Sequence, residues 1–286
     1  MMIFREAFLI SPSGFCERKN LILAKKRLKK LNFVCSYRQD ILGRFLCYAG
    51  SAQRRVDEMN QAYTSGAQVI FSLIGGMGEV HLVDSLDYDL IRKANKVLVG
   101  SSDVTLLLNA IYQKTGARCF HGMNIGKTNV PHKKTISSFL DALERRDYQV
   151  RVRKRDIFRK GFIQAPIVGG NVELLGRSLG TTHEIDTDGQ IIFLEDYDMK
   201  TWRVFDILWQ LKIAGKFDGV KGIILGYFTK CGKDIDLYLK EFFKEFTCPV
   251  IMHQPIGHQE PNLTIPLGEN CIIDTESQFW KISFKK

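Results

Sequence analysis

The chain has 286 residues, 45% of them hydrophobic and 25% charged, which is the composition of a folded globular protein of about two domains. A chain of this length buries enough apolar surface to fold without cross-links, so a small protein stabilised by disulfide bonds is excluded. The ordinary glycine and proline content excludes extensive disorder. Lysine and arginine (41) exceed aspartate and glutamate (31), so the net charge of +10 favours anionic partners, from nucleic acid to small acidic substrates.

The seven cysteines are an odd number without CxxC spacing, and the sequence holds no HExxH motif or Cys/His cluster. We therefore expect reduced thiols, no metal and no other cofactor. The apolar stretch at residues 1–10 is interrupted by Arg5 and Glu6, unlike a signal peptide. No segment approaches the ~18 apolar residues of a membrane span. These features predict a cytoplasmic protein.

Short apolar runs alternate with amphipathic stretches in the first half of the chain. The predicted strands are residues 7–10, 33–37, 69–74, 97–99 and 118–120, and the predicted helices are residues 18–31, 52–65, 84–95 and 103–114. This alternation predicts a parallel sheet covered by helices on both faces. Ligands bind such sheets beyond the carboxyl ends of the strands, so we expect the chemistry in the loops after Ile74 and Val99.

A basic segment interrupts this pattern: eight of the 17 residues at 144–160 are lysine or arginine. Beyond it the sequence predicts a helix ending at 179, helices at 200–214 and 235–246, strands at 190–194 and 222–225, and β segments near 250 and over 271–284. We therefore predict an α/β protein with an N-terminal parallel-sheet domain at 1–143, a basic linker at 144–163 and a smaller C-terminal α+β domain at 164–286.

The most informative local feature is a buried strand that turns sharply through Ser101, Ser102 and Asp103 into a helix. At such a turn a serine hydroxyl projects from the sheet edge. The N–H of the next residue and the positive end of the helix then face any oxyanion that forms. The same residue types also cap helices routinely, so simple capping is the alternative interpretation of this stretch alone.

A glycine-rich turn, Gly75-Gly76-Met77-Gly78, follows the preceding apolar strand. It offers unobstructed backbone N–H groups, as an oxyanion hole or a phosphate nest requires. It is neither a GxGxxG nor a Walker sequence. A tight turn that only glycine can make is the structural alternative.

An acid and a base for the serine are sought in the second half. Glu195 ends an apolar strand, where a carboxylate can orient an imidazole and stabilise its cation, and Asp196 is the second candidate. An exposed strand-end acid or a helix cap is the alternative. His258 stands in a loop with three prolines and two glycines, and rigid loops position catalytic groups well, whereas His121 and His81 are competitors.

Taken in chain order, these motifs resemble the LD-carboxypeptidase family of serine peptidases over almost the whole chain. The matching motifs are SPSG (11–14), YAGS (48–51) with Arg55, GGMG (75–78), LDYDLI (86–91), GSSD (100–103), FHG (120–122), GGN (169–171), LGT (179–181), FLED (193–196), GH (257–258) and LTIPLG (263–268).

The resemblance implies a catalytic triad spread over two domains, with Ser102 as nucleophile, Glu195 as carboxylate and His258 as base. It also implies an oxyanion hole from the backbone N–H groups of Gly76 and Asp103. Of these two donors, the strand-to-helix turn indicates Asp103 independently.

Three positions depart from the family pattern. Ser101 stands where relatives commonly have tyrosine or histidine, Met77 stands where an aromatic residue is usual, and His81 stands where an arginine is frequent. Arg203 does match the family, and it could pair with a substrate carboxylate or with an acid at the domain interface.

For function, the resemblance implies a homodimeric enzyme of peptidoglycan recycling that releases terminal D-alanine from cytosolic murein tetrapeptides. A microcin-immunity-type peptidase that cleaves a peptide–nucleotide conjugate is the second interpretation, although the chain lacks obvious room for longer nucleotide-binding loops. A non-catalytic binder of acidic polymer, using residues 25–30 and the basic linker, is the third. Those lysines lie on one polar helix face without aromatic platforms, which favours a solvated surface. We therefore expect neither nucleic acid nor membrane as a partner.

Overall fold

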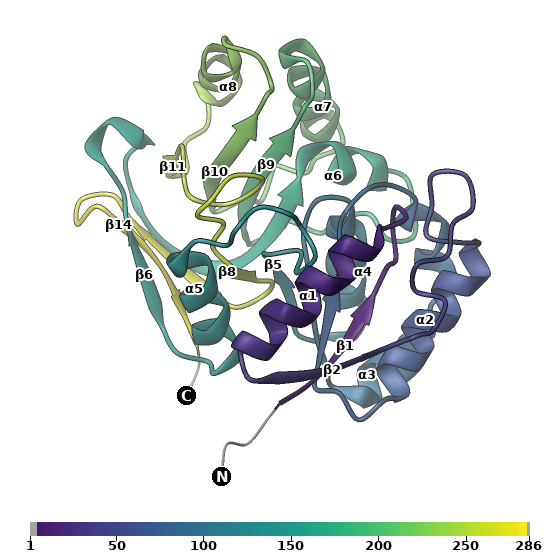
Figure 1. Cartoon of the computed structure of the whole chain (residues 1–286). Helices are drawn as coiled ribbons and strands as arrows, with labels where there is room; N and C mark the ends of the chain where they lie inside the picture. Colours follow the sequence, from purple (N-terminus) through teal and green to yellow (C-terminus); the bar gives the residue numbers. More distant parts are fainter. Residues whose placement is uncertain (1–4, 285–286) are drawn as a thin grey trace. The chain divides into compact units, whose positions relative to one another are not determined.

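The structure is a computed structural model that describes residues 5–284 and divides into two compact units, Met1–Val130 and Pro131–Lys286 (Figure 1). The first four residues of the apolar stretch at 1–10 lie outside the described part. No helix within residues 5–284 has the length and apolar run needed to cross a bilayer.

The first unit is built on a parallel sheet whose strands follow the order β2-β1-β3-β4-β5. The strands are β1 (Arg5–Ile10), β2 (Phe33–Tyr37), β3 (Val69–Ser72), β4 (Val97–Gly100) and β5 (Cys119–His121). The helices are α1 (Arg18–Lys30), α2 (Ala52–Thr64), α3 (Tyr88–Ala94) and α4 (Thr105–Thr115), with short 3₁₀ turns η1 (Glu79–His81), η2 (Val83–Ser85) and η3 (Ser102–Val104).

This strand order reverses at β1, because the chain moves outward to β2 and then returns to β3 on the other side of β1. Right-handed crossovers place α1 on one face of the sheet and the remaining three helices on the other, and α3 packs against both α2 and α4. The loops after β1 and β3 therefore lead to helices on opposite faces, and the carboxyl edge between these two strands is where ligands of such sheets bind. The predicted helix-covered parallel sheet is confirmed.

One predicted helix of this unit differs in detail. Residues 84–95 divide into η2 and α3, because the Asp87 carboxylate accepts a hydrogen bond from the Leu90 N–H at 2.8 Å and starts a new helix at Tyr88.

The second unit contains an eight-stranded mixed sheet in the order β6-β14-β13-β8-β9-β10-β11-β7. Its strands are β6 (Tyr148–Arg151), β7 (Ile157–Arg159), β8 (Phe162–Asn171), β9 (Ile191–Tyr197), β10 (Gly222–Thr229), β11 (Val250–Ile251), β13 (Asn270–Asp274) and β14 (Phe279–Ser283), while β12 (Ile265–Pro266) lies outside this sheet. The central strands β8 to β11 are parallel, and the flanking pairs are antiparallel.

The helices of this unit are α5 (Lys133–Leu143), α6 (Val172–Ser178), α7 (Thr201–Ile213) and α8 (Ile235–Phe243), with the 3₁₀ turn η4 (Lys154–Asp156). Because α6, α7 and α8 each follow a parallel strand, the residues that end β8, β9 and β10 gather at one edge of the sheet. Strand β9 is the buried centre of this unit, and residues 191–194 are at most 1% exposed.

The basic segment at 144–163, which we expected to be a linker, supplies β6, η4, β7 and the first residues of β8. Its charges fit a strand because they alternate: Gln149 and Arg151 are exposed, while Tyr148 and Val150 are partly buried. Charged side chains on the edge strands β6 and β7 also discourage edge-to-edge association. The prediction of a linker, which was based on composition, was therefore wrong for these strands. The sequence analysis also missed helix α5.

Candidate active site

Ser102 lies on a sharp turn between the buried strand β4 and helix α4. Ser101 is extended (φ −157°), whereas Ser102 has φ +65°, a left-handed conformation that is strained for a residue with a side chain. Ser102 is half-buried between the buried Ser101 and Asp103. Neither Ser101 at the start of η3 nor Val104 at the start of α4 makes a side-chain capping hydrogen bond. The turn thus presents a hydroxyl at the sheet edge.

Asn124, which the sequence analysis missed, holds this turn from the loop after β5. Its Oδ1 accepts a hydrogen bond from the Ser101 N–H at 3.1 Å, and its Nδ2 donates to the Ser101 carbonyl and hydroxyl oxygens at 3.2 Å. The side chain is 3% exposed. An asparagine two residues beyond the FHG motif was the available signal, but the contact joins loops that are 23 residues apart.

The glycine turn after β3 lies directly against Ser102. A Cβ atom at Gly75 would meet the Ser102 Cβ at 2.9 Å and the Ser102 Oγ at 3.1 Å. Gly76 has φ +131°, and a Cβ there would meet the Gly14 nitrogen at 2.7 Å. Glycine is therefore required at both positions, by close approach at Gly75 and by backbone conformation and close approach at Gly76.

Arg55, from α2, fastens the loops after β1 and β3 to one another. Its Nη1 donates to the carbonyl oxygens of Pro12 and Gly78 at 2.8 and 2.9 Å. Its guanidinium lies 5.2 Å from the centre of the Tyr48 ring, and its Nη2 is 3.5 Å from His81 Nδ1. Burial lowers the pKa of Arg55. His81 therefore contacts the guanidinium of Arg55.

In the second unit, Glu195 and His258 form a close pair at the end of β9. The distance between Glu195 Oε2 and His258 Nδ1 is 2.7 Å, and the two side chains are 0% and 9% exposed. Because a carboxylate only accepts hydrogen bonds, Nδ1 carries the proton and Nε2 keeps a lone pair that can accept one. The Tyr197 ring stacks on the imidazole at 4.8 Å with 23° between the planes, which fixes its orientation.

The loop that carries His258 is held by local contacts. Gly257 has φ +119°, and a Cβ there would lie 2.7 Å from Glu195 Oε2. Its N–H donates to Asn262 Oδ1 at 2.8 Å. The Thr135 hydroxyl of α5 accepts from the Asn262 N–H at 2.8 Å and donates to Glu260 Oε2 at 2.6 Å. Helix α5 thereby fixes residues 260–262, which follow His258 in the loop.

Asp196, the second candidate acid, forms its hydrogen bonds with the end of β8, the start of α6 and its own strand. Its carboxylate accepts hydrogen bonds from Asn171 Nδ2 (3.1 Å), the Glu173 N–H (3.0 Å) and the Tyr197 N–H (2.7 Å). Burial, with the nearby Glu195 charge as the second cause, raises the pKa of Asp196 to about 7. Asp196 therefore joins β9 to the start of α6, and Glu195 is the acid at the imidazole.

The remaining candidates lie in other settings. Arg203, on α7, is 56% exposed and lies 3.7 Å from Glu173, which also pairs with Arg177. His121 is a fully buried residue of β5. Within residues 5–284 the structure brings together no group of three or more histidine, cysteine or carboxylate side chains that could hold a metal ion.

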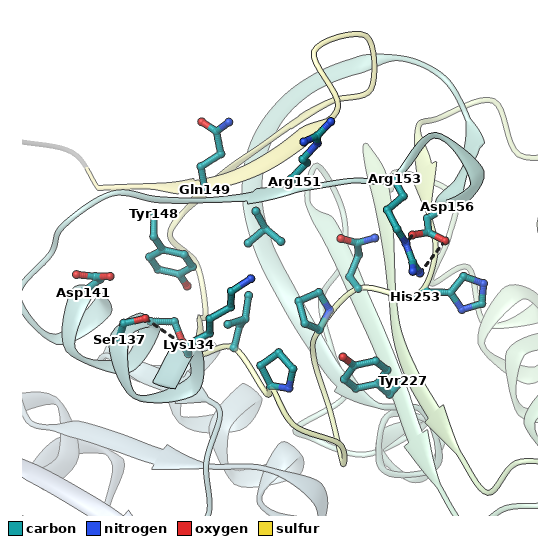
Figure 2. Close-up of a pocket in the computed structure, with 16 residues that line it drawn as sticks. Lys134, Ser137, Asp141, Tyr148, Gln149, Arg151, Arg153, Asp156, Tyr227 and His253 are labelled. Carbon is teal, nitrogen blue, oxygen red and sulfur yellow. Dashed lines mark hydrogen bonds and ion pairs between the residues drawn. The ribbon is translucent and has the colours of Figure 1, made fainter. Parts of the chain in front are cut away.

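A cavity of about 750 Å³ opens in the second unit beside α5 and β6 (Figure 2). Figure 2 shows Lys134 and Tyr148 on one side and the Arg153–Asp156 ion pair with Tyr227 on the other. Pro255, Pro261 and Leu263 of the His258 loop also line it, but His258 and Glu195 do not. The predicted acid–base pair is therefore not part of this cavity.

The chemistry that these residues can perform follows from their geometry. The first unit supplies a hydroxyl on a strained turn beside glycine N–H groups, and the second supplies an imidazole oriented by a buried carboxylate. A nucleophile, a base and an orienting acid are the components of covalent acyl transfer. The chain therefore carries the side-chain types that this class of hydrolase uses.

Comparison with known proteins identifies the family. Residues 8–122 match the LD-carboxypeptidase N-terminal domain and residues 164–273 match the LD-carboxypeptidase C-terminal domain, so the chain belongs to the LD-carboxypeptidase family. The resemblance found in the sequence motifs is confirmed.

The chain is similar to proteins with different described functions. The chain is 27% identical to the probable murein peptide carboxypeptidase of Bacillus subtilis (strain 168), over 93% of this chain and 88% of that protein. It is 28% identical to the microcin C7 self-immunity protein MccF of Escherichia coli, over 80% and 78% of the two chains. The crystal structure of an MccF-like protein from Bacillus anthracis str. Ames matches with a TM-score of 0.88 at 25% identity, over 100% of this chain and 98% of that one.

Proposed function

We propose that the protein is a serine carboxypeptidase that releases terminal D-alanine from murein tetrapeptides in the cytoplasm, as a step of peptidoglycan recycling. The observation that carries the proposal is the pairing of His258 with the buried Glu195 at 2.7 Å, in a family member that has Ser102 on a left-handed turn. Similarity to the murein peptide carboxypeptidase of B. subtilis supports the substrate class.

In the proposed mechanism, His258 Nε2 takes the hydroxyl proton of Ser102 while the Ser102 oxygen attacks the carbonyl carbon of the scissile amide. The backbone N–H groups of Gly76 and Asp103 hold the resulting oxyanion. The Glu195 carboxylate stabilises the imidazolium of His258, which then gives its proton to the leaving amine of D-alanine. This step breaks the C–N bond and leaves an ester on Ser102.

Water completes the proposed cycle. His258 takes a proton from a water molecule that attacks the ester carbonyl, and the same proton returns to the Ser102 oxygen as the C–O bond breaks. The shortened peptide leaves with a new carboxylate, and the enzyme regains its starting state.

Electrostatics supports an acidic peptide as the substrate. The chain carries a net charge of +10, and murein peptides carry several carboxylates. We propose that Arg203 contributes a substrate contact, because its pairing with Glu173 at 3.7 Å is exposed and weak enough to exchange. We further propose a homodimer without nucleic-acid or membrane partners.

A microcin-immunity activity is the second candidate function. The similarity to MccF of E. coli favours it, because that relative is as close in identity as the murein carboxypeptidase relative. The same serine, histidine and glutamate would then cleave a peptide–nucleotide conjugate, so the substrate distinguishes the two candidates.

The test compares the wild-type protein with the Ser102→Ala variant on two substrates. We expect the wild type to release D-alanine from a murein tetrapeptide, measured by mass spectrometry, and the variant to lose at least about 10³-fold in kcat, because removal of a nucleophile leaves only binding and oxyanion stabilisation. Turnover of an aminoacyl-sulfamoyl-adenylate without D-alanine release would favour the second candidate. Equal D-alanine release by both proteins would disprove the serine mechanism.

A further inference from the structure

Glu79 is a fully buried acid beside the proposed site that the mechanism does not use. It lies in η1, directly after the glycine turn, and is 0% exposed. The Ser13 hydroxyl donates to its Oε1 at 2.5 Å, and its own N–H donates to Asp103 Oδ2 at 3.4 Å. Among the described residues, none of the basic side chains forms an ion pair with Glu79.

The surroundings of Glu79 favour a neutral carboxyl group. Burial raises the pKa of Glu79 well above its usual value, and the neighbouring Asp103 carboxylate acts in the same direction, while Arg55 opposes them. The other titratable groups nearby, Tyr48 and His81, both pack against Arg55. Two buried carboxylates side by side cannot both ionise cheaply, so this environment favours the protonated form of Glu79.

These contacts join three loops at the carboxyl edge of the sheet. Ser13 follows β1, Glu79 follows β3, and Asp103 follows β4 directly after Ser102. Arg55 binds carbonyl oxygens of the first two loops but donates to none in the third. Glu79 therefore contacts both neighbouring loops: its side chain binds Ser13, and its backbone N–H binds the Asp103 carboxylate beside Ser102.

We propose that Glu79 is a positioning residue that, through its contacts with Ser13 and Asp103, holds the glycine turn and the Asp103 N–H in place around Ser102. The inference rests on the proposed serine chemistry, because the N–H groups of Gly76 and Asp103 are its oxyanion donors. Glu79 itself does not touch the substrate. Loss of its proton places two negative charges in one buried site and separates the two turns.

The test measures the rate at which a fluorophosphonate labels Ser102 in the full chain from about pH 6 to pH 10. This reagent reports the activated serine without any peptide substrate. In the wild type we expect the rate to fall at alkaline pH, when Glu79 loses its proton. Glu79→Gln keeps a donor and an acceptor but cannot ionise, so its labelling rate lacks the fall at alkaline pH. In Glu79→Ala we expect the reagent to label Ser102 about 10-fold to 100-fold more slowly at every pH. The control is Glu6→Gln, at an exposed position, and its labelling rate should follow that of the wild type at every pH.

The outcomes separate this inference from the proposed function. If Glu79→Gln shows the same alkaline fall as the wild type, the positioning role is wrong even though the serine is active. That comparison holds if Glu79→Ala fails to fold. If the wild type is labelled but releases no D-alanine, only the substrate assignment fails. If Ser102 is not labelled at all, the serine mechanism and the role of Glu79 fail together.

Discussion

Ser102 depends on the absence of a side chain at Gly75. The glycine turn approaches the serine so closely that one methyl group would occupy the space of its Cβ and Oγ atoms. Gly75 is not among the glycines with positive φ, so the requirement there is steric and not conformational. Gly75 therefore sets the position of the candidate nucleophile as well as forming a turn.

We predict that Gly75→Ala displaces the Ser102 hydroxyl and lowers kcat about 10²-fold, because a shift of about 1 Å in a reacting atom has an effect of that size. The matched control is Gly116→Ala. Gly116 ends α4 with φ +69°, and a Cβ atom there would meet nothing within 4 Å, so this variant loses about 1 kcal/mol of stability through strain alone. Steady-state kinetics and urea unfolding of both variants separate the two effects. Equal activity of the two variants would contradict the prediction.

Helix α5 determines where the His258 loop lies within the second unit. The hydroxyl groups of Thr135 and Ser138 accept hydrogen bonds from the N–H groups of Asn262 and Thr264. Both hydroxyl-bearing residues are buried, on the inner face of the helix. The loop has no regular secondary structure around His258, so these helix contacts supply the order that a strand would otherwise provide.

We predict that Thr135→Val lowers stability by about 1–3 kcal/mol, because it leaves the Asn262 N–H and the Glu260 carboxylate without their shared partner at nearly constant volume. We also expect kcat to fall while KM changes little, since the imidazole loses its fixed position. Ser137→Ala, on the exposed face of the same helix, is the control and should change neither quantity. Urea unfolding and steady-state kinetics provide the measurements. A Thr135→Val enzyme with normal kcat would show that α5 does not position the base.

At the scale of the whole molecule, buried acids with raised pKa values make stability depend on pH. Asp196, with a pKa of about 7, binds a proton in the folded protein at pH values where the unfolded chain has released it. Its contribution to stability is therefore present below about pH 4 and is lost as the pH rises through 7. Glu58, whose pKa burial also raises to about 7, acts in the same direction.

We predict that the free energy of unfolding falls less steeply between about pH 5 and pH 7.5 in Asp196→Asn than in the wild type, by roughly 2 kcal/mol over that range. The slope is the test, because asparagine also changes the hydrogen bonds of this site. Asp147→Asn is the control: Lys281 lowers the pKa of Asp147, so that residue affects stability only at more acidic pH. Urea titrations across this range measure both slopes. Parallel curves for Asp196→Asn and the wild type would contradict the assignment.

The sequence by itself determined the class of the fold and the family. Strands β3 and β4 are buried along their whole length, so the sequence shows them as apolar runs. The motifs around Ser102, Glu195 and His258 are contiguous in the sequence. Short-range patterns were therefore sufficient to identify the fold class and the family. The same patterns failed where charge alternates along an edge strand, as in β6, since composition averages over its two faces.

Only the tertiary structure decided which side chains contact one another within each unit. The choice of Glu195 over Asp196 depends on which carboxylate faces the imidazole, and the contacts of Asn124, Thr135 and Glu79 join loops that are 23 to 127 residues apart. Such contacts depend on how strands order themselves in a sheet and not on any local propensity. No spacing along one chain encodes them without the fold.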